Sequence, residues 1–420
     1  MTSNLTALVD ADNFYVSCER IFRPELRHRP VVVLSNNDSC VVARSREVKE
    51  LGVKMGTPLY QIRDLVRSEK IVVFSSNYEL YGDISARVMN ILSRFSGNLE
   101  TYSIDEAFIQ LPPEKADTLC EQIIQTCRDW ISIPVKIGVA PTKTLSKAAA
   151  ELVKQENPSL RYKILLNQKE IDSALTRIPL EDVWGIGQKT VEKLKQHGIT
   201  TPLQLKYMPE QHIRKHFNIT LLRTVTELGG KTCFELENQP SPQKNLCHSK
   251  SFGRSISKYQ DLREAVVSYA TEAAAKLRRR KLIAPSVSVF ILTSRFNQPI
   301  NHYANSACLP LTPPSNDTPA IVKSATKGLE RIYKSGYMYK KCGILLNDLI
   351  PEAELQPDMF VPQDPRDKAI SEAMDTINSL YGPDSISLAA AGSRQPKWKM
   401  SRKYQSARYT TQWNDILTVR

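Results

Sequence analysis

Two acidic clusters in the first 110 residues carry side chains that could bind metal ions. Asp10 ends an apolar run, and Asp105 and Glu106 interrupt a run of strand-forming residues. Carboxylates at a strand end beside an acidic turn would form an oxygen cage, which suits Mg²⁺, a hard cation that also takes substrate phosphates as ligands. Two such ions about 4 Å apart activate a hydroxyl and stabilise a leaving pyrophosphate. Either cluster alone is more often a strand or turn cap, so the surroundings decide.

The elements expected around these acids indicate an α/β or α+β catalytic body. Short apolar runs bounded by polar turns predict strands, and a helical pattern follows the last of them. The strands are expected at 5–9, 31–34, 70–74 and 135–139, and the helix at 143–155. From about Ile171 the pattern becomes helical.

A polar, proline-containing stretch at 238–244 resembles a linker and precedes a further α/β unit. Its helix is expected at 261–280 and its strands at 286–293 and 342–346. Beyond Asp348 the chain is rich in Pro, Asp and Gln, so we expect limited structure there.

Composition sets the class of protein and the kind of partner. The chain has 420 residues, enough for two or more domains, and its net charge of +13 favours a polyanionic partner. Its eight cysteines are scattered without a C-x-x-C pair, which favours free buried thiols in a reducing cytoplasm over a zinc site or disulfides. No run of about 18 apolar residues occurs, and the first ten residues do not form a secretory signal, so we expect no membrane association.

Together the motifs resemble the Y-family DNA polymerases. D-x-D-x-F-Y at Asp10 to Tyr15 and Y-S-I-D-E-A-F at Tyr102 to Phe108 are similar to the catalytic palm signature of that family. Further segments resemble its UmuC branch. They are Val33 to Asp38, Gly52 to Gly56, Phe74 to Tyr81, Thr142 to Leu145, Val183 to Gly187 and Arg408 to Thr411. The resemblance covers essentially the whole chain.

The resemblance implies an α+β multidomain fold, a right-handed polymerase with palm, short fingers, a helical thumb containing a helix-hairpin-helix, and an α/β little finger. The expected boundaries are 1–28 and 75–168 for the palm, 29–74 for the fingers, 169–238 for the thumb, 239–244 for a linker, 245–350 for the little finger and 351–420 for a partner-binding tail.

By the same resemblance, Asp10, Asp105 and Glu106 are catalytic and hold two Mg²⁺ ions together with the backbone carbonyl of Ala11. Asp12 is left out of the metal shell because this position need not be acidic in the UmuC branch.

Nucleotide selection is expected from Tyr15, which follows Phe14 and would act as a steric gate that collides with a ribose 2′-oxygen. The triphosphate of the deoxynucleotide is expected to bind Lys49 and Lys154. Arg46 lies one helical turn before Lys49 and is included on that geometry.

Primer-template DNA is expected at two places. Gly185 and Gly187 resemble the turn of a helix-hairpin-helix, where backbone N–H groups and a helix N-terminus meet a phosphate, and Lys189 follows them. In the little finger, Arg278, Arg279 and Arg280 belong to the densest basic run in the chain. The basic and aromatic strip at 392–409 could bind nucleic acid or dock a partner, and the sequence does not decide between the two.

Protein partners are expected at the C-terminal side. Gln356, Met359 and Phe360 resemble the short peptide that binds the bacterial β sliding clamp. The tail beyond Val361 is the expected docking element for a UmuD′-like dimer and for the RecA filament, which rests on the resemblance alone. The protein would be cytoplasmic, and associated with the nucleoid when active.

The expected function is error-prone translesion synthesis, in which deoxynucleotides are added to a primer 3′-end opposite damaged template during SOS-type DNA repair and mutagenesis. A nucleotidyl cyclase on a related palm would explain the acids but would not need the hairpin or the basic run. A catalytically silent DNA-binding scaffold would explain the hairpin and the basic run but not three intact acids.

Overall fold

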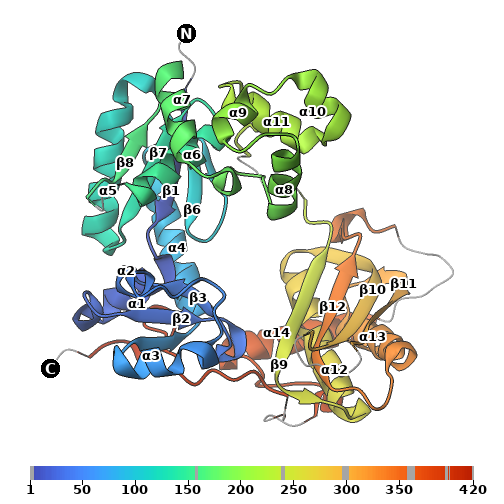
Figure 1. Cartoon of the computed structure of the whole chain (residues 1–420). Helices are drawn as coiled ribbons and strands as arrows, with labels where there is room; N and C mark the ends of the chain where they lie inside the picture. The colour runs from blue at the N-terminus through green and yellow to red at the C-terminus, as the bar shows by residue number, and fades with distance from the viewer. Residues whose placement is uncertain are drawn as a thin grey trace. The chain divides into compact units, whose positions relative to one another are not determined.

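The computed structural model describes residues 4–156, 159–237, 242–295, 302–356, 365–392, 396 and 398–418. The chain forms two compact units (Figure 1). The first comprises Met1–Ser35, Ser39–Pro240 and Tyr404–Arg420, and the second comprises Asn36–Asp38 and Ser241–Lys403. All eight cysteines are free, and Cys18, Cys120, Cys127 and Cys342 are buried, whereas Cys247 and Cys308 are exposed, contrary to the expected burial. Among the described residues, no helix has the length and apolar character needed to cross a membrane.

The first unit is built on a sheet with the strand order β5-β6-β1-β7-β8. These strands are β5 (Leu99–Thr101), β6 (Glu106–Leu111), β1 (Leu5–Ala11), β7 (Val135–Ala140) and β8 (Tyr162–Ile164). All seven residues of β1 are buried, because β6 and β7 pair with it on both sides and helices cover the sheet. The helices packed with it are α1 (Phe14–Phe22), α4 (Tyr78–Leu92), α5 (Ala116–Ile131) and α6 (Lys143–Gln155).

Helix α6 lies directly against β7 because Gly138 has no side chain. A Cβ at Gly138 would lie 2.2 Å from the Ser146 carbonyl oxygen and 2.3 Å from the Ala150 nitrogen, so any larger residue would push the helix away. The helix begins at a side-chain cap, where the Leu145 N–H donates to the Thr142 hydroxyl at 3.3 Å. The position of α6 matters because this helix carries lysines into the candidate site.

Two smaller groups of elements complete the first unit. A sheet with the order β3-β2-β4 corresponds to the expected fingers, and a set of helices corresponds to the expected thumb. The former contains β2 (Val31–Leu34), β3 (Val41–Arg44), α2 (Arg46–Glu50), α3 (Arg63–Ser68) and β4 (Val72–Ser75). The latter contains α7 (Gln168–Arg177), α8 (Gln188–Gln196), α9 (Pro202–Lys206), α10 (Glu210–His216) and α11 (Ile219–Leu228). Strand β4 starts two residues later than expected, after Lys70 adopts a left-handed turn conformation with φ 50°.

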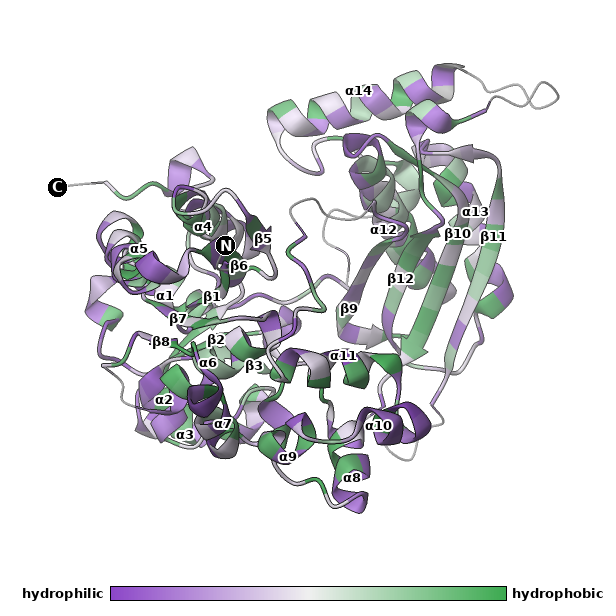
Figure 2. Ribbon diagram, turned by 90° about the horizontal axis from the view of Figure 1, so that it is seen from above, coloured by the Kyte–Doolittle hydropathy of each residue, from purple (hydrophilic) through white to green (hydrophobic). Residues whose placement is uncertain are grey.

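The second unit has an antiparallel sheet with the order β11-β10-β12-β9, against which α12 and α13 pack. Its elements are β9 (Leu246–Ile256), α12 (Tyr259–Arg279), β10 (Leu282–Thr293), β11 (Ala304–Ser315), α13 (Thr318–Ile332), β12 (Tyr339–Asn347) and β13 (Ile350–Pro351). Hydrophobic residues run along β10 and β12 (Figure 2). The expected helix and both expected strands are present, and the strands are longer than expected.

The region after Asp348 has more structure than the sequence indicated, because it contains α14 (Pro365–Tyr381). This helix packs on the second unit through Ser371 and Met374, which are buried, and through an ion pair between Asp375 and Arg278. Hydrophobic and hydrophilic bands alternate along it (Figure 2). The sequence signal was the spacing of Ile370, Met374 and Ile377, which the surrounding polar composition concealed.

Candidate active site

The three expected catalytic acids lie near the same end of strands β1 and β6. In the register of β1 with β6, Asp10 lies directly opposite Glu106, and the Ala11 N–H donates to the Asp105 carbonyl oxygen at 2.9 Å. Burial raises the pKa of the Asp10 carboxyl to about 6, although Lys154 opposes this and Glu106 adds to it. The fold thus brings together acids that are about 95 residues apart in the sequence.

Each acid already has a polar partner. The Lys154 Nζ lies 2.8 Å from the Asp10 Oδ2, and the Lys147 Nζ lies 3.0 Å from the Glu106 Oε2. The Ser103 hydroxyl donates to the Asp105 Oδ1. Both lysines come from α6, where a spacing of seven residues places them on one face.

The donor types of these acids suit a hard cation, and Lys154 and Lys147 supply positive charge to Asp10 and Glu106 here. All three donors are carboxylate oxygens, the ligand type that Mg²⁺ prefers. Asp10 is 7% exposed, so a buried anion at this position requires a neighbouring positive charge. Within the described parts of the chain, no group of three or more His, Cys, Asp or Glu side chains is close enough to hold a metal ion.

A cluster of cationic side chains lies beside the acids. Burial lowers the pKa of Lys49 on α2, and the charges of Arg44, Lys136 and Lys154 lower it further. The Lys136 Nζ lies 3.7 Å from the Asp12 Oδ2. The Arg44 Nε and Nη1 are buried without a hydrogen-bond partner among the described residues. Burying cationic side chains and unpartnered donors costs free energy, and a cluster of them is typical of a site that binds a polyanion.

Arg46 differs from the other nucleotide-binding candidates. It lies one turn before Lys49, but its side chain is 61% exposed and its Nε is 2.9 Å from the Glu50 Oε1 of the same helix. This (i, i+4) pair on the helix surface is a common solvated arrangement. In this arrangement Arg46 therefore makes an exposed ion pair on α2.

The candidate steric gate begins α1, immediately after the first acid. Asn13 has a left-handed conformation with φ 49°, which turns the chain from β1 into the helix. Phe14 is buried, and the half-buried ring of Tyr15 stacks on Tyr81 with ring centroids 4.4 Å apart. Burial raises the pKa of Tyr15 to about 12, and the nearby charge of Asp105 contributes. The gate residue and the acids therefore share one local environment.

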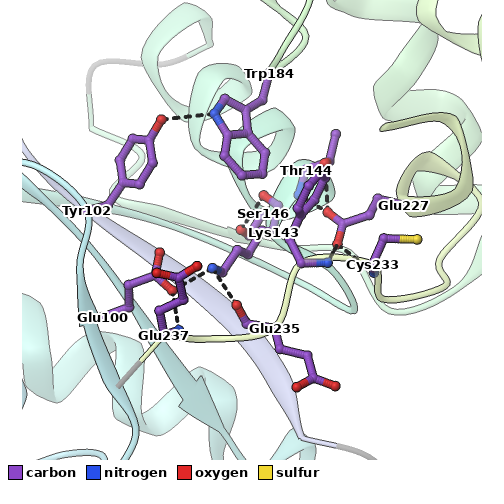
Figure 3. Close-up of polar contacts among 11 residues, drawn as sticks. Glu100, Tyr102, Lys143, Thr144, Ser146, Trp184, Glu227, Cys233, Glu235 and Glu237 are labelled. Carbon is purple, nitrogen blue, oxygen red and sulfur yellow. Dashed lines mark hydrogen bonds and ion pairs between the residues drawn. The ribbon is translucent and has the colours of Figure 1, made fainter. Parts of the chain in front are cut away.

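Polar contacts join the helices of the expected thumb to the expected palm (Figure 3). Glu227 of α11 is completely buried, and its carboxylate accepts hydrogen bonds from the backbone N–H groups of Thr144, Cys233 and Phe234. Nearby, the Trp184 indole N–H donates to the Tyr102 hydroxyl at 3.0 Å. These contacts anchor both the start of α6 and the expected hairpin.

The expected hairpin residues are accessible at the turn before α8. Gly185, Gly187 and Lys189 are all exposed, and Gly185 has φ +84°, a conformation that other residues rarely adopt. Gly187 caps α8, so the N-terminus of that helix opens onto the same turn. The arrangement suits an incoming phosphate.

The three expected arginines of the little finger differ in their surroundings. The Arg278 side chain is 9% exposed and makes a bidentate pair with Asp375, with both nitrogen–oxygen distances below 3.0 Å. It also donates to the Asn316 carbonyl oxygen at 2.6 Å. The structure thus gives Arg278 a role in holding α14, whereas Arg279 and Arg280 are exposed.

Of the expected clamp peptide, Gln356 is exposed, whereas Met359 and Phe360 lie outside the described residues. Several further residues were missed at the site: Arg44, Lys136, Lys147, Glu19 and Tyr81. Lys147 could have been found from its position seven residues before Lys154 on the same expected helix. Arg44 interrupts the end of an apolar run, which was an equally local signal.

Comparisons with known proteins agree with this arrangement. Residues 9–151 match the impB/mucB/samB family, residues 243–359 match the C-terminal domain of that family, and residues 169–199 match its helix-hairpin-helix motif. Residues 368–419 match a domain of unknown function. Together these matches cover most of the chain.

Relatives and solved structures extend the match to nearly the whole chain. The chain is 40% identical to the protein UmuC of Salmonella typhimurium over 424 residues, covering 99% of this chain and 100% of the relative. It is 39% identical to the protein SamB of the same species, over 98% of both chains. A Y-family DNA polymerase chimera built on Dbh superposes with a TM-score of 0.69 at 20% identity, covering 83% of this chain and 99% of the chimera.

The fold is that of a Y-family DNA polymerase. More closely, the chain belongs to the impB/mucB/samB family and is an error-prone translesion DNA polymerase of the UmuC type. The cyclase and the silent scaffold are thereby set aside.

Proposed function

We propose that Asp10, Asp105 and Glu106, with the Ala11 carbonyl, bind two Mg²⁺ ions and that this site adds deoxynucleotides to a primer 3′-end opposite damaged template. The observation that carries the proposal is the direct pairing of Asp10 with Glu106 across β1 and β6. When bound, two such ions favour loss of the proton from the attacking hydroxyl and stabilise the leaving pyrophosphate.

The chain's own cations prepare the site for the incoming triphosphate. Lys154 is placed to exchange the Asp10 carboxylate for a phosphate oxygen, because the two groups are only 2.8 Å apart. Lys49 and Arg44 add positive charge on the fingers side, and the unpartnered nitrogens of Arg44 supply free donors. Arg46 joins this set only by breaking its ion pair with Glu50.

Tyr15 selects the sugar by exclusion. Its ring is held against Tyr81 and next to Asp105, so a ribose 2′-oxygen would meet a fixed aromatic surface. Phe14 lies buried behind it and supports the start of α1. A deoxynucleotide lacks this oxygen and fits.

Primer extension with Mg²⁺ on undamaged and abasic templates tests the metal site. Asp105→Asn keeps the shape of the side chain but removes its charge, and we expect extension to fall roughly 10²–10³-fold, as when a group that stabilises developing charge is removed. Asp83→Asn is the matched control, since the Asp83 carboxylate is half-buried and pairs with Arg87 of the same helix, α4. Equal activity of the two variants would refute the assignment.

DNA is proposed to bind through Gly185, Gly187 and Lys189 of the thumb and through Arg279 and Arg280 of the little finger. All five are exposed, whereas the bidentate pair of Arg278 with Asp375 favours a supporting role for that residue. Loss of one phosphate contact lowers the dependence of log affinity on log salt by about one unit. Lys189→Gln is expected to do so in a primer-template binding titration, and an unchanged slope would exclude the contact.

The C-terminal side is proposed to bind protein partners: the β sliding clamp at Gln356, Met359 and Phe360, and a UmuD′-like dimer and RecA filament through the tail. Supporting this, α14 exposes an apolar stripe on one side. The exposed fractions are 50% for Ile370, 36% for Ile377, 72% for Leu380 and 78% for Tyr381. Uncovered apolar side chains at this spacing are typical of a helix that docks on another protein.

Two variants on α14 test whether its apolar stripe binds a protein partner or only faces solvent. Ile377→Asp places a charge in the stripe, whereas Ser379→Asp places it on the opposite side of the same helix. We expect Ile377→Asp alone to weaken binding of the UmuD′-like dimer in sedimentation experiments with purified proteins. Equal binding by both variants would remove the stripe from the interface.

We further propose that the protein works on the nucleoid in the cytoplasm, as its relationship to UmuC favours.

A further inference from the structure

The C-terminal segment, residues 404–418, is built into the first unit. The Ser75 N–H donates to the Tyr404 carbonyl oxygen at 2.9 Å, and the Tyr404 N–H donates to the Ser75 hydroxyl at 3.0 Å. The ring of Tyr409 stacks on Phe22 of α1 with centroids 4.6 Å apart. These contacts join the segment to α1 and to the end of β4.

Asn77 is the principal receptor for this segment. It is completely buried, and its side-chain nitrogen lies 2.9 Å from the Ser406 hydroxyl and 3.0 Å from the Ala407 carbonyl oxygen. Its side-chain oxygen accepts from the Leu80 N–H at the start of α4. One amide therefore caps the helix that carries Tyr81 and also holds the segment.

The Ser406 hydroxyl then reaches a buried acid. It donates to the Glu19 Oε1 at 2.9 Å, and the Tyr81 hydroxyl donates to the same oxygen at 2.7 Å. Glu19 and Tyr81 are both completely buried, and the Glu19 Oε2 has no hydrogen-bond partner among the described residues. An acid placed in such a site is held by these two hydroxyls, so losing either leaves it poorly compensated.

The far end of this chain of contacts is the candidate steric gate. The Tyr81 ring stacks on Tyr15 with an interplanar angle of 13°. Tyr78 meets both rings edge-on, with centroids 6.0 Å from Tyr15 and 6.2 Å from Tyr81. Tyr15 cannot tilt away from the sugar position unless Tyr81 moves, and the Tyr81 hydroxyl is fixed by Glu19.

We propose that Ser406, Glu19 and Tyr81 are positioning residues for the steric gate, so that the C-terminal segment contributes to rejection of ribonucleotides. The effect on selection rests on the proposed role of Tyr15, whereas the positioning of its ring does not. None of the three residues needs to touch the nucleotide. A role confined to stability would lower resistance to unfolding and leave sugar selection unchanged.

The test combines sugar selection with a direct probe of Tyr15 in the full-length chain. Ser406→Ala and Tyr81→Phe each remove one hydroxyl while keeping the surrounding packing. Ser93→Ala is the matched control, because Ser93 lies exposed at the end of the same helix and its hydroxyl donates to the Asn90 carbonyl oxygen. For each variant, kcat/KM is measured for a deoxynucleotide and for the matching ribonucleotide.

The second readout requires no catalysis. Tyr15 is replaced by 3-fluorotyrosine, and its ¹⁹F resonance is recorded for the parent and for each variant. We expect Ser406→Ala and Tyr81→Phe to move this resonance and to reduce discrimination against the ribonucleotide roughly tenfold, as when a buried acceptor loses one hydrogen-bond partner. Ser93→Ala is expected to change neither quantity.

The outcomes separate this inference from the role of the gate itself. If Tyr15→Ala leaves sugar selection unchanged, the gate assignment fails, and the fluorine signal alone decides whether the positioning contacts exist. If Tyr15→Ala abolishes selection while Ser406→Ala and Tyr81→Phe change neither readout, the positioning role is overturned. A moved resonance with unchanged selection would overturn the contribution to ribonucleotide rejection.

Discussion

The buried acid Glu19 makes the stability of the first unit dependent on pH in a way that one substitution should abolish. Burial raises its pKa from the ordinary 4.5 to about 7, against the hydrogen bonds from Tyr81 and Ser406 and the charge of Arg23. Because the folded state holds the proton more tightly than the unfolded state, the contribution to stability is fully present below 4.5. It is lost as the pH rises through about 7.

The size of this effect follows from the shift. A difference of about 2.5 pH units, from 4.5 to about 7, corresponds to about 3 kcal/mol of unfolding free energy at 1.36 kcal/mol per unit. Glu19→Gln stays neutral at every pH and keeps an oxygen that can accept from both hydroxyls. Relative to the parent, the variant should therefore gain most of this amount as the pH is raised.

Urea unfolding at about pH 5 and about pH 8 measures the difference, with the free energies of parent and variant compared at each pH. Glu69→Gln is the control, since Glu69 is exposed at the end of α3. Other groups near Glu19, namely Cys18, Tyr81 and Tyr409, have pKa values raised by burial and do not titrate in this range. Parallel curves for Glu19→Gln and the parent would refute the buried, titrating carboxyl.

Three further predictions concern the thumb, the hairpin and the triphosphate site. Glu227→Ala should lower the unfolding free energy by about 3 kcal/mol, because N–H groups of α6 and of the chain after α11 lose their acceptor. A loss below about 1 kcal/mol in urea unfolding would contradict this. Gly185→Ala should weaken primer-template binding more than the control Gly198→Ala. Both glycines have positive φ (84° and 79°), so an alanine is similarly strained at either position. Equal binding by the two variants in a titration would show that the turn at Gly185 does not contact DNA. Arg44→Ala should raise the KM for deoxynucleotides roughly tenfold with no loss of thermal stability. An unchanged KM with a lowered Tm would show that Arg44 stabilises the fold and does not bind the nucleotide.

The sequence predicted the parts of this molecule whose signals are local. The strand at 5–9 and the helix at 143–155 follow from apolar runs and periodicity; the structure confirms the helix and extends the strand to Ala11. The meeting of Asp10 with Glu106 could be inferred only through the resemblance, because strand pairing between distant segments leaves little trace in a single sequence. Arg46 was chosen by helical spacing, which says which residues are neighbours but not which way the helix faces.

Contacts between residues far apart in the sequence could not be predicted from local sequence patterns. Ser406 lies 387 residues from Glu19, and nothing in the local pattern of either segment indicates the other. Glu19 reads as an ordinary charged residue of a short helix, whereas it is completely buried. Arg278 reads as part of a basic helix end, but its partner Asp375 belongs to a helix whose composition resembled a loop.

The return of residues 404–418 to the first unit also has a consequence for how the protein is made. Ser406 is translated 329 residues after Asn77, which at roughly 5–20 residues per second means roughly 15–65 seconds on the ribosome. Throughout that interval the Asn77 amide and the Glu19 carboxyl lack Ser406, which has not yet been translated. The packing around Asn77 and Glu19 is therefore completed only after the second unit has been translated.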